Sequence, residues 1–358
     1  MTPRKRVLAV LNNQPVDRIP VDLWYTGEVG ASLKQHFKVK NDFELYQAMN
    51  LDKIVWLFPG YKNPAADKFT GSQVGAQAVG ERTAWGVPLK PIQSSDAVYH
   101  EFGTPPLKEY NSAAMLDKYE FWPKADYFDY QGSLELAKKV SPTYATIGPW
   151  ISFFEVYCQM RGLEQSLMDL LTDESFASEI LDRIEDCQTK MLKKFLQVLE
   201  DNLDLVFISD DMGMQQSLLI SPSIWKTFFE ARMKRWCDLI HSYNKKVFYH
   251  SDGAVEPLIP YLIECGIDIL NPIQHACPGM DTAELKKKYG SRVMFHGGID
   301  NQSVLPFGKP EDVRVETKNC LNTLGSSGKG YIVCSCHNVQ AGTPVENIIA
   351  MVETVTKG

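Results

Sequence analysis

The sequence contains no long hydrophobic run. Nowhere in its 358 residues does an apolar stretch approach the length of a membrane helix, which needs roughly 18 uncharged apolar residues. Near the start, 7–11 is the longest apolar run, and a secretory signal needs a longer one. We therefore expect a cytoplasmic protein without a membrane partner.

The chain also has fewer basic than acidic residues. The chain has 37 Lys and Arg against 44 Asp and Glu, which gives a net charge of −7. Nucleic-acid-binding proteins carry clustered basic residues, and the one short basic stretch here, 4–6, is predicted to be the solvated start of a helix. No nucleic-acid partner is expected. The hydrophobic fraction of 44% is high enough for a large core.

Two further patterns are missing. The eight cysteines are spread along the chain without a CxxC pair, a distribution typical of reduced thiols rather than of a disulfide framework. No glycine-rich loop follows the first predicted strand, which argues against a dinucleotide-binding fold.

Short apolar runs recur along the chain, and helical patterns separate them. Alternation of buried strands and helices indicates a parallel sheet covered by helices. The predicted strands are 19–24, 51–57, 144–147, 205–208, 247–249, 267–270, 293–295 and 331–333. The predicted helices are 162–171, 175–201, 222–243, 255–265, 281–289 and 311–324.

The strand ends distinguish an open sheet from a closed barrel. Nearly every predicted strand is followed by ionisable or amide residues. In a barrel the carboxyl ends of all strands converge on one mouth, where a site is built from many strands. We therefore predict an α/β fold, a (β/α)8 TIM barrel formed by residues 1–358 as a single domain. Residues 60–125 are predicted to form an insertion or β-hairpin region near the barrel mouth.

His250 and Asp252 follow the strand at 247–249. Side chains two residues apart at a strand end point to the same side, and imidazole and carboxylate groups can bind one metal ion. The alternative is a histidine hydrogen-bonded to a turn aspartate that holds the turn at Gly253.

The strand at 331–333 is followed by Cys334, Cys336 and His337. At most two of these three side chains can face the mouth. We expect Cys334 in the core and His337 at the mouth, as a ligand or a catalytic group, with Cys336 as an alternative ligand.

Asp210 and Asp211 follow the strand at 205–208. Adjacent side chains on a strand point in opposite directions, and we place Asp211 at the mouth. His296 is expected to be a hydrogen-bonded core histidine. Arg161 and Glu164 lie three residues apart, the spacing of neighbours on one helix face. Glu155 either contacts the substrate or lies with them at a Glu–Arg pair that supports the wall of the site. The residues predicted to contact the substrate are Trp24, Tyr25, Glu155, Gln274 and Asn338.

Several stretches resemble the uroporphyrinogen decarboxylase superfamily. They are RKRVLAVLNNQPVDRIPVDLW, LISPSIWKTFFEARMKRW, FYHSDG, GIDILNPIQ, FHGGIDNQSVLPFG and HNVQAGTPVENIIAMVE. They extend over most of the chain and are densest after residue 205. The resemblance implies a (β/α)8 barrel, in agreement with the strand pattern.

The superfamily contains two chemistries. Its decarboxylases bind porphyrinogen carboxylates through an arginine-rich segment of the form W-x-M-R-Q-A-G-R. The corresponding segment here, DLWYTGE at 22–28, has no arginine and two acids. We expect those acids to repel a polyanionic porphyrinogen, which argues against decarboxylation.

The other branch consists of corrinoid-dependent methyltransferases. The members that act on thiols resemble this chain but hold zinc through H-x-C and a later cysteine. His250 matches the histidine, while Asp252 and His337 replace the two cysteines. The resemblance therefore implies a zinc site at His250, Asp252 and His337. A nitrogen and oxygen ligand set favours an ether or amine substrate over a thiol.

The resemblance thus implies a substrate-side methyltransferase. It would pass a methyl group from a small methoxylated or N-methylated compound, O-demethylation being favoured, to cob(I)alamin on a partner corrinoid protein. His337, Asp211 and His250 are the expected catalytic residues, and a homodimer is one expected assembly. The alternatives are a cofactor-free decarboxylase-like lyase and a non-catalytic subunit that binds a corrinoid or tetrapyrrole.

Overall fold

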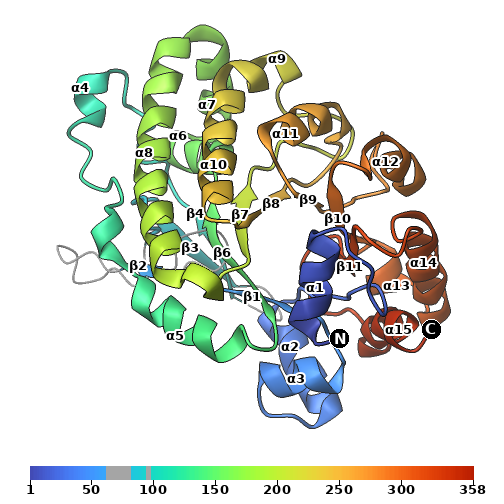
Figure 1. Cartoon of the computed structure of the whole chain (residues 1–358). Helices are drawn as coiled ribbons and strands as arrows, with labels where there is room; N and C mark the ends of the chain where they lie inside the picture. The colour runs from blue at the N-terminus through green and yellow to red at the C-terminus, as the bar shows by residue number, and fades with distance from the viewer. Residues whose placement is uncertain (62–81, 94–97) are drawn as a thin grey trace.

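The centre of the protein is a seven-stranded parallel sheet (Figure 1). The computed structural model describes residues 1–61, 82–93 and 98–358. The strands lie in the order β1-β6-β7-β8-β9-β10-β11. Their bounds are β1 Ile54–Trp56, β6 Ala145–Ile151, β7 Leu205–Ser209, β8 Lys246–His250, β9 Ile269–Asn271, β10 Met294–Ile299 and β11 Tyr331–Ser335. The order in the sheet follows the order in the sequence, so each strand of this sheet pairs with the one that precedes it in the sheet.

An extended segment at 20–26 bridges the two edge strands of this sheet. The amide of Val333 in β11 donates to the carbonyl of Pro20 at 2.9 Å, and Asp22 N–H donates back to the Val333 carbonyl at 2.8 Å. The amide of Asp52, just before β1, donates to the carbonyl of Val21 at 2.8 Å. The predicted first strand is thus an extended segment with isolated bridges, and the sheet curls into a TIM-barrel-like fold.

Helices cover the outside of the sheet. Helices α5 and α8 pack on β6, α10 packs on β8, and α14 packs on β10 and β11. The helices are α1 Pro3–Leu11, α2 Gly27–Phe37, α3 Asp42–Ala48, α4 Ala113–Leu116, α5 Tyr130–Val140, α6 Phe154–Arg161, α7 Leu163–Thr172, α8 Glu174–Leu199, α9 Pro222–Trp225, α10 Ala231–Ser242, α11 Ile259–Cys265, α12 Thr282–Tyr289, α13 Val304–Phe307, α14 Pro310–Thr323 and α15 Val345–Thr356. None of these described helices has the length and apolarity needed to span a bilayer.

The local sequence explains where several helices begin and end. The hydroxyl of Ser221 accepts the amide of Ile224 and caps α9. Helix α11 ends at Gly266, whose φ of 106° is left-handed. The predicted helix at 222–243 is interrupted by a π-helical turn, Lys226–Glu230, between α9 and α10.

Alternate residues of the strands fill the inside of the sheet. Phe207, Phe248, Ile269 and Ile332 pack together there, and α1 contributes Val7, Val10 and Leu11 to the same cluster. Helix α1 therefore covers the amino ends of the strands. The same alternation brings Ser209, His250 and Asn271, the last residues of β7, β8 and β9, to the carboxyl end of this interior.

The basic start of the chain is not solvated as expected. Arg6 is 6% exposed. It forms ion pairs with Asp17 at 2.7 Å and with the fully buried Asp52, and Arg18 pairs with the other oxygen of Asp52 at 2.5 Å. Buried charges persist only when they are paired, so this stretch ties α1 to the chain before β1.

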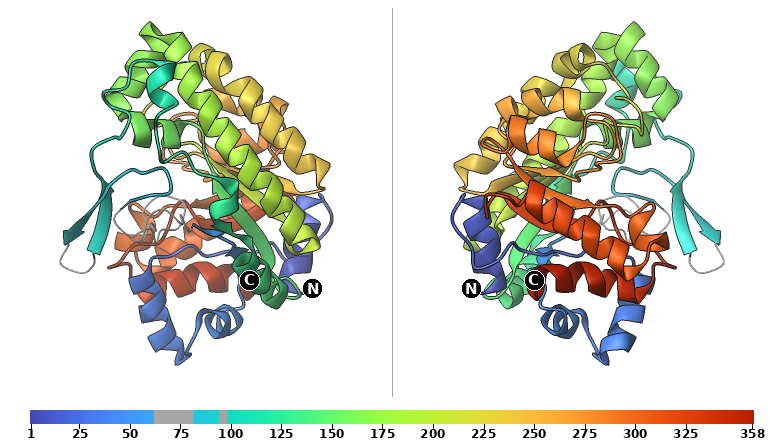
Figure 2. Two further views of the ribbon diagram at one scale, coloured as in Figure 1. Left: turned by 90° about the vertical axis from the view of Figure 1, so that its left-hand side faces the viewer. Right: turned by 90° about the vertical axis from the view of Figure 1, so that its right-hand side faces the viewer.

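The region between β1 and α5 holds the antiparallel elements. Strands β3 Leu89–Gln93 and β4 Val98–Phe102 form a hairpin that extends from the body of the molecule (Figure 2). Strands β2 Gly60–Tyr61 and β5 Phe128–Asp129 form a second antiparallel pair. Part of the predicted insertion at 60–125, namely 62–81 and 94–97, lies outside the described residues.

Arg161 ties this region to the helices. Its guanidinium donates to the carbonyls of Leu107 and Tyr110, each at 2.7 Å, and pairs with Asp169 of α7 at 2.6 Å. The predicted partner of Arg161 was a glutamate, but Glu164 is exposed. Asp169, eight residues after Arg161, is the actual counter-ion.

Candidate metal and methyl-transfer site

Three side chains from two strand ends converge above the barrel interior. His250 ends β8, Asp252 follows it, and His337 follows β11. One nitrogen of each imidazole and one carboxylate oxygen of Asp252 all lie within 4.8 Å of one another. The rings of His250 and His337 have centroids 6.0 Å apart at an angle of 62°. These are the three residues that the sequence proposes as metal ligands.

His250 is oriented by hydrogen bonding on one side and by acids on the other. Nδ1 lies 2.5 Å from the side-chain oxygen of Asn271, while Nε2 is 3.7 Å from Asp211 and 3.9 Å from Asp252. Burial works to lower the pKa of His250, but the two carboxylates and the hydrogen bond outweigh it and the pKa is raised. Nε2 therefore faces a strongly negative environment.

Asp252 carries a buried oxygen without a hydrogen-bond partner. Its Oδ1 has no hydrogen bond to any described residue, and burial raises the pKa of this carboxyl. Such an atom costs free energy unless something binds it. The backbone of Asp252 is fixed, because its amide donates to Asp211 at 2.9 Å.

His337 supplies a second imidazole nitrogen. The side chain is half-buried, and burial lowers its pKa despite the opposing charge of Asp252. A neutral imidazole is the form that binds a metal ion. Two imidazoles and a carboxylate match the ligand types of zinc.

Asp210 and Asp211 have different environments. Asp210 is fully buried and accepts the hydroxyl of Ser152 and the amide of Phe154, both at 2.6 Å. It anchors the start of α6, and burial raises its pKa to about 7. Asp211 is the partly exposed member of the pair, and its Oδ1 is the oxygen that faces His250.

Glu155, on the first turn of α6, is half-buried beside these acids. Its Oε1 accepts a hydrogen bond from the hydroxyl of Ser209. Burial, together with the charge of Asp211, raises the pKa of Glu155 to about 8. A carboxyl of that pKa holds its proton at neutral pH and can act as an acid.

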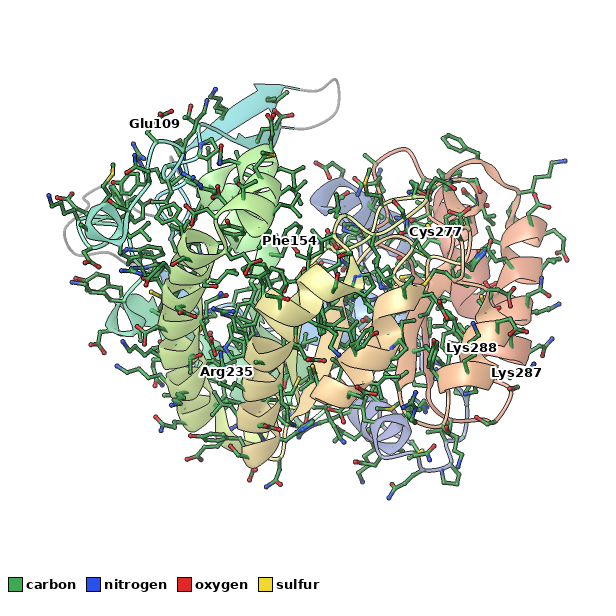
Figure 3. All side chains as sticks on the ribbon, turned by 90° about the horizontal axis from the view of Figure 1, so that it is seen from above. Glu109, Phe154, Arg235, Cys277, Lys287 and Lys288 are labelled. Carbon is green, nitrogen blue, oxygen red and sulfur yellow. The ribbon has the colours of Figure 1, made fainter. Side chains whose placement is uncertain are left out.

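The two aromatic residues predicted to contact the substrate have different surroundings. Trp24 is buried in the barrel interior, with its ring centroid 6.2 Å from that of His250, and its indole N–H donates to Asp22 at 2.9 Å. Tyr25 packs against Gly30 of α2, outside the barrel interior. Phe154, labelled in Figure 3, is buried with its ring edge-on to Phe229 at 5.9 Å, whereas Lys287 and Lys288 lie on the outer surface.

The remaining predicted residues have structural contacts. Gln274 accepts the amide of Gly253 at 2.5 Å and supports the turn after Asp252. Asn338 is half-buried on the loop after β11. The structure does not place Cys336 with the proposed ligands, because its thiol points to the carbonyl of Ile273 at 3.3 Å.

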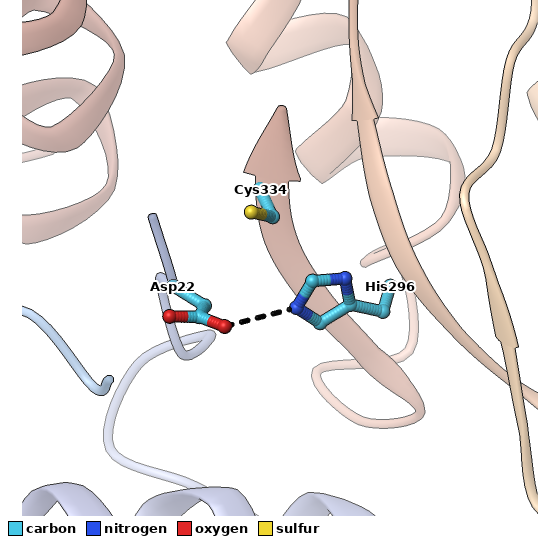
Figure 4. A group of neighbouring side chains, drawn as sticks. All are labelled: Asp22, His296 and Cys334. Atoms are coloured by element: carbon cyan, nitrogen blue, oxygen red, sulfur yellow. Dashed lines mark hydrogen bonds and ion pairs between the residues drawn. The ribbon is translucent and has the colours of Figure 1, made fainter. Parts of the chain in front are cut away.

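A second group of potential ligands lies deeper in the barrel (Figure 4). Asp22, His296 and Cys334 are all fully buried. Asp22 forms an ion pair with Lys53 at 2.8 Å and lies 3.3 Å from Nε2 of His296. Sequence reasoning missed the roles of Lys53 and Asn271, because strand alternation does not tell which groups an inward-facing side chain contacts.

This arrangement corrects the argument from the two acids at 22–28. Asp22 is neutralised by Lys53 in the barrel interior, and Glu28 lies in the first turn of α2. Asp22 therefore presents no uncompensated charge to a substrate at the strand ends. The absence of arginine from the segment still removes the carboxylate-binding groups that the decarboxylase pattern carries.

A groove of about 560 Å³ lies beside the proposed ligands. It is lined by residues of three loops, at 216–222, 254–257 and 278–279. None of His250, Asp252 and His337 lines it, although Ala254 and Glu256 belong to the loop that carries Asp252. The groove is therefore adjacent to the ligand cluster and separate from it.

Comparison with known proteins identifies the family and supports the fold. Residues 84–358 match the family profile described as uroporphyrinogen decarboxylase (URO-D). The uroporphyrinogen decarboxylase of Coxiella burnetii is 24% identical over 158 residues, which cover 42% of this chain and 40% of the relative. The methylated-thiol–coenzyme M methyltransferase of Methanosarcina mazei is 25% identical over 221 residues, 61% of this chain and 54% of the relative. The matches thus span about half or less of these relatives.

The fold agrees over the whole chain with one solved structure. A methyltransferase from Methanosarcina mazei superposes with a TM-score of 0.68 at 17% identity and covers 100% of this chain and 99% of the other. At this level of identity the likeness concerns the fold. The α/β fold with a curled parallel sheet, predicted from the strand pattern, is therefore confirmed, and it is consistent with a TIM-barrel-like architecture.

Proposed function

Because this chain belongs to the uroporphyrinogen decarboxylase family, we propose that it is the methyltransferase kind of member rather than a decarboxylase. It would transfer a methyl group from a small methoxylated or N-methylated compound to cob(I)alamin on a partner corrinoid protein. The likeness to two proteins named as methyltransferases supports this proposal. The favoured substrate is a methyl ether.

The observation that carries the proposal is the convergence of His250, Asp252 and His337 within 4.8 Å. The residues fit a zinc ion by two criteria. Two imidazoles and a carboxylate are zinc ligands, and Oδ1 of Asp252 is buried without a partner. Three protein ligands leave a coordination position for a substrate, as catalytic zinc sites require. A bound zinc ion would act as a Lewis acid that makes an ether oxygen or amine nitrogen a better leaving group.

The residues around the ligands supply the proton for the reaction. When the carbon–oxygen bond of a methyl ether breaks, its electron pair stays on the oxygen, and that oxygen must take up a proton. Glu155, with a pKa of about 8, holds such a proton beside Asp211 and His250. The methyl carbon is transferred to cobalt(I), which supplies the electron pair of the new bond. Atoms and charge therefore balance without another reactant.

Asp210 keeps the acid in place. It accepts the amides of Phe154 and Glu155 at 2.6 and 3.3 Å, so the first turn of α6 is tied to the end of β7. Orientation of the acid and the leaving group is most of what an enzyme contributes to an in-line displacement. Asp210 acts through Glu155 and is a positioning residue.

The test is methyl transfer by the zinc-loaded protein under anaerobic conditions. Free cob(I)alamin, or a corrinoid protein that carries it, is mixed with a panel of methoxylated aromatics and N-methylated amines, and methylcobalamin formation is followed by absorbance. Transfer from a methyl ether, lost in His250→Ala but kept in His36→Ala, is expected. Glu155→Gln should lower the rate about 10²- to 10⁴-fold, the usual contribution of a positioned acid.

Two other outcomes of this experiment would favour the alternatives, a decarboxylase-like lyase and a non-catalytic subunit. Decarboxylation of a porphyrinogen without added cofactor, with no methylcobalamin from any compound, would overturn the proposal in favour of a lyase. Binding of cobalamin without turnover of either substrate class would instead indicate a non-catalytic subunit.

A further inference from the structure

A chain of hydrogen bonds leads from His250 into the barrel interior. Nδ1 of His250 lies 2.5 Å from Oδ1 of Asn271, and Nδ2 of Asn271 lies 2.8 Å from Nδ1 of His296. Nε2 of His296 then lies 3.3 Å from Asp22. The chain ends at Lys53, 2.8 Å from the other oxygen of Asp22. Each of these residues is 6% exposed or less.

The contacts at the inner end of this hydrogen-bond chain determine which of its atoms donate and which accept. The Asp22 carboxylate is paired with Lys53 and can only accept hydrogen bonds. Nε2 of His296 must therefore carry the proton. If Nδ1 of His296 also carried one, it would point a proton at the NH2 group of Asn271. His296 is consequently neutral, with a bare Nδ1.

The orientation of the Asn271 amide follows independently. Its Nδ2 is 3.3 Å from the carbonyl oxygen of His296 as well as 2.8 Å from Nδ1 of the same residue. Rotating the amide by 180° would place its oxygen against that carbonyl oxygen, where the two acceptors repel each other, and would leave the carbonyl without the donor that Nδ2 supplies. The NH2 group therefore faces His296, and the amide oxygen faces His250.

We propose that Asn271 and His296 are positioning residues that hold His250 as the tautomer protonated on Nδ1. In this tautomer the lone pair of Nε2 faces Asp252 and His337. The tautomer assignment rests on the hydrogen-bond geometry alone; its consequence for zinc binding rests on the proposed function. A ligating histidine is commonly fixed by such a hydrogen bond from its other nitrogen, and loss of it typically lowers metal affinity 10- to 100-fold.

The cluster of Asp22, His296 and Cys334 is accordingly part of this chain and not a second metal site. Oδ1 of Asp22 accepts from Lys53 and from the amide of Leu23, each at 2.8 Å. Its Oδ2 accepts from Trp24 and His296, at 2.9 and 3.3 Å. Both oxygens are therefore already satisfied, in contrast to Oδ1 of Asp252.

The first test uses the unmodified, metal-free protein with ¹⁵N-labelled histidine. Long-range ¹H–¹⁵N spectra at alkaline pH, where both rings are neutral, report which nitrogen of each ring is protonated. The peaks are assigned by their absence from His250→Gln and His296→Gln. We expect His250 protonated on Nδ1 and His296 on Nε2. The opposite tautomer at either ring would overturn the proposal.

The second test measures zinc affinity by competition with a chelator. Asn271→Leu removes the acceptor and should weaken zinc binding about 10- to 100-fold. Asn271→Asp keeps an acceptor for Nδ1–H of His250 and should restore most of that loss. Equal affinity in Asn271→Leu and the unmodified protein, when both are folded, would contradict the proposal. If Asn271→Leu does not fold, the spectra of the unmodified protein still decide.

These tests separate the two proposals. The expected tautomers without any zinc binding would refute the metal site and leave the hydrogen-bond chain intact. Tight zinc binding by His250 with the opposite tautomers would refute the proposed roles of Asn271 and His296. It would leave the metal site intact.

Discussion

Gly213 lies directly against the backbone of Asp252. A β-carbon built at Gly213 would be 2.3 Å from the Asp252 carbonyl oxygen and 2.8 Å from Cγ1 of Val255. No real β-carbon approaches a carbonyl oxygen so closely. Gly213 thus helps to fix the position of a proposed zinc ligand without supplying an atom to the site.

Gly213→Ala should therefore weaken zinc binding. The added methyl group must push the Asp252 backbone away, and displacement of a ligand by a fraction of an ångström is enough to lower affinity. We expect a loss of at least about 10-fold, comparable with that from a missing supporting interaction. Gly27→Ala is the control, because a β-carbon there meets nothing within 4 Å. Equal affinities in the two variants would show that the loop is free to move.

Zinc content should depend on each of the three proposed ligands. Protein purified without a histidine tag is expected to bind about one zinc per chain, and His250→Ala or His337→Ala should lose it because two protein ligands remain. Elemental analysis after dialysis measures the content. His36→Ala, which removes an exposed histidine of α2, should keep the metal. Zinc retained by both ligand variants would contradict the site.

Glu155 should make the metal-free protein less stable at higher pH. Its folded pKa, about 8, lies above that of an unfolded glutamate, so the folded state binds its proton more tightly. The resulting stabilisation is fully present below about pH 4.3 and is lost as the pH rises through 8. The slope is at most about 1.4 kcal/mol per pH unit for one proton.

Chemical denaturation between pH 5 and 8 measures this dependence. Glu155→Gln should flatten the fall in the free energy of unfolding, whereas Glu164→Gln on the exposed face of α7 should not. Parallel pH profiles for Glu155→Gln and the unmodified protein would show that Glu155 titrates normally.

Arg161 should be a major contributor to stability. Its guanidinium is 6% exposed and serves Asp169 and three carbonyls of the segment 107–110. Replacing it with Met leaves a buried carboxylate without its partner, which costs about 3–5 kcal/mol. Arg235→Met removes an ion pair with Glu185 in which the arginine side chain on α10 is 56% exposed, and it should cost about 0–1 kcal/mol. Similar losses in denaturant unfolding of the two variants would contradict the assignment.

His275 should stabilise the fold mainly at acidic pH. Its Nε2 lies 2.9 Å from Glu316, and that hydrogen bond, against the opposing effect of burial, raises the pKa of His275. The pair stabilises fully below the unfolded pKa of about 6.5, and the contribution disappears as the pH rises through the folded value. Denaturation curves of His275→Gln should show the largest loss of stability at low pH. A loss that does not change with pH would contradict the charge-based explanation.

The strand pattern was readable from the sequence because its cause is local. Parallel strands buried on both faces must be short apolar runs, and the polar residues after 247–249 and 331–333 mark where those runs end. The convergence of Asp252 and His337 on His250 then follows from closure of the sheet. The first strand was less regular than expected, because 20–26 bridges two edges through a few hydrogen bonds and not through a continuous ladder.

The partners of buried charges were not readable. The pairs of Arg161 with Asp169 and of Asp22 with Lys53 depend on which groups are enclosed together once the helices pack, and nothing in the spacing selects them. The different surroundings of Trp24 and Tyr25 were not readable for the same reason. Trp24 and Tyr25 are adjacent in sequence, but strand alternation sends one into the barrel interior and the other toward α2.

The sequence by itself determined the class of fold, which follows from periodicity. It also named the candidate ligands His250, Asp252 and His337, through the residues at the strand ends together with the resemblance to methyltransferases that hold zinc. Tertiary structure alone decided the role of Asn271. An asparagine at the end of β9 has no special signal in the sequence. Its amide lies between two histidines only because β8, β9 and β10 are hydrogen-bonded neighbours, and their inward-facing residues are therefore brought to the same level of the barrel.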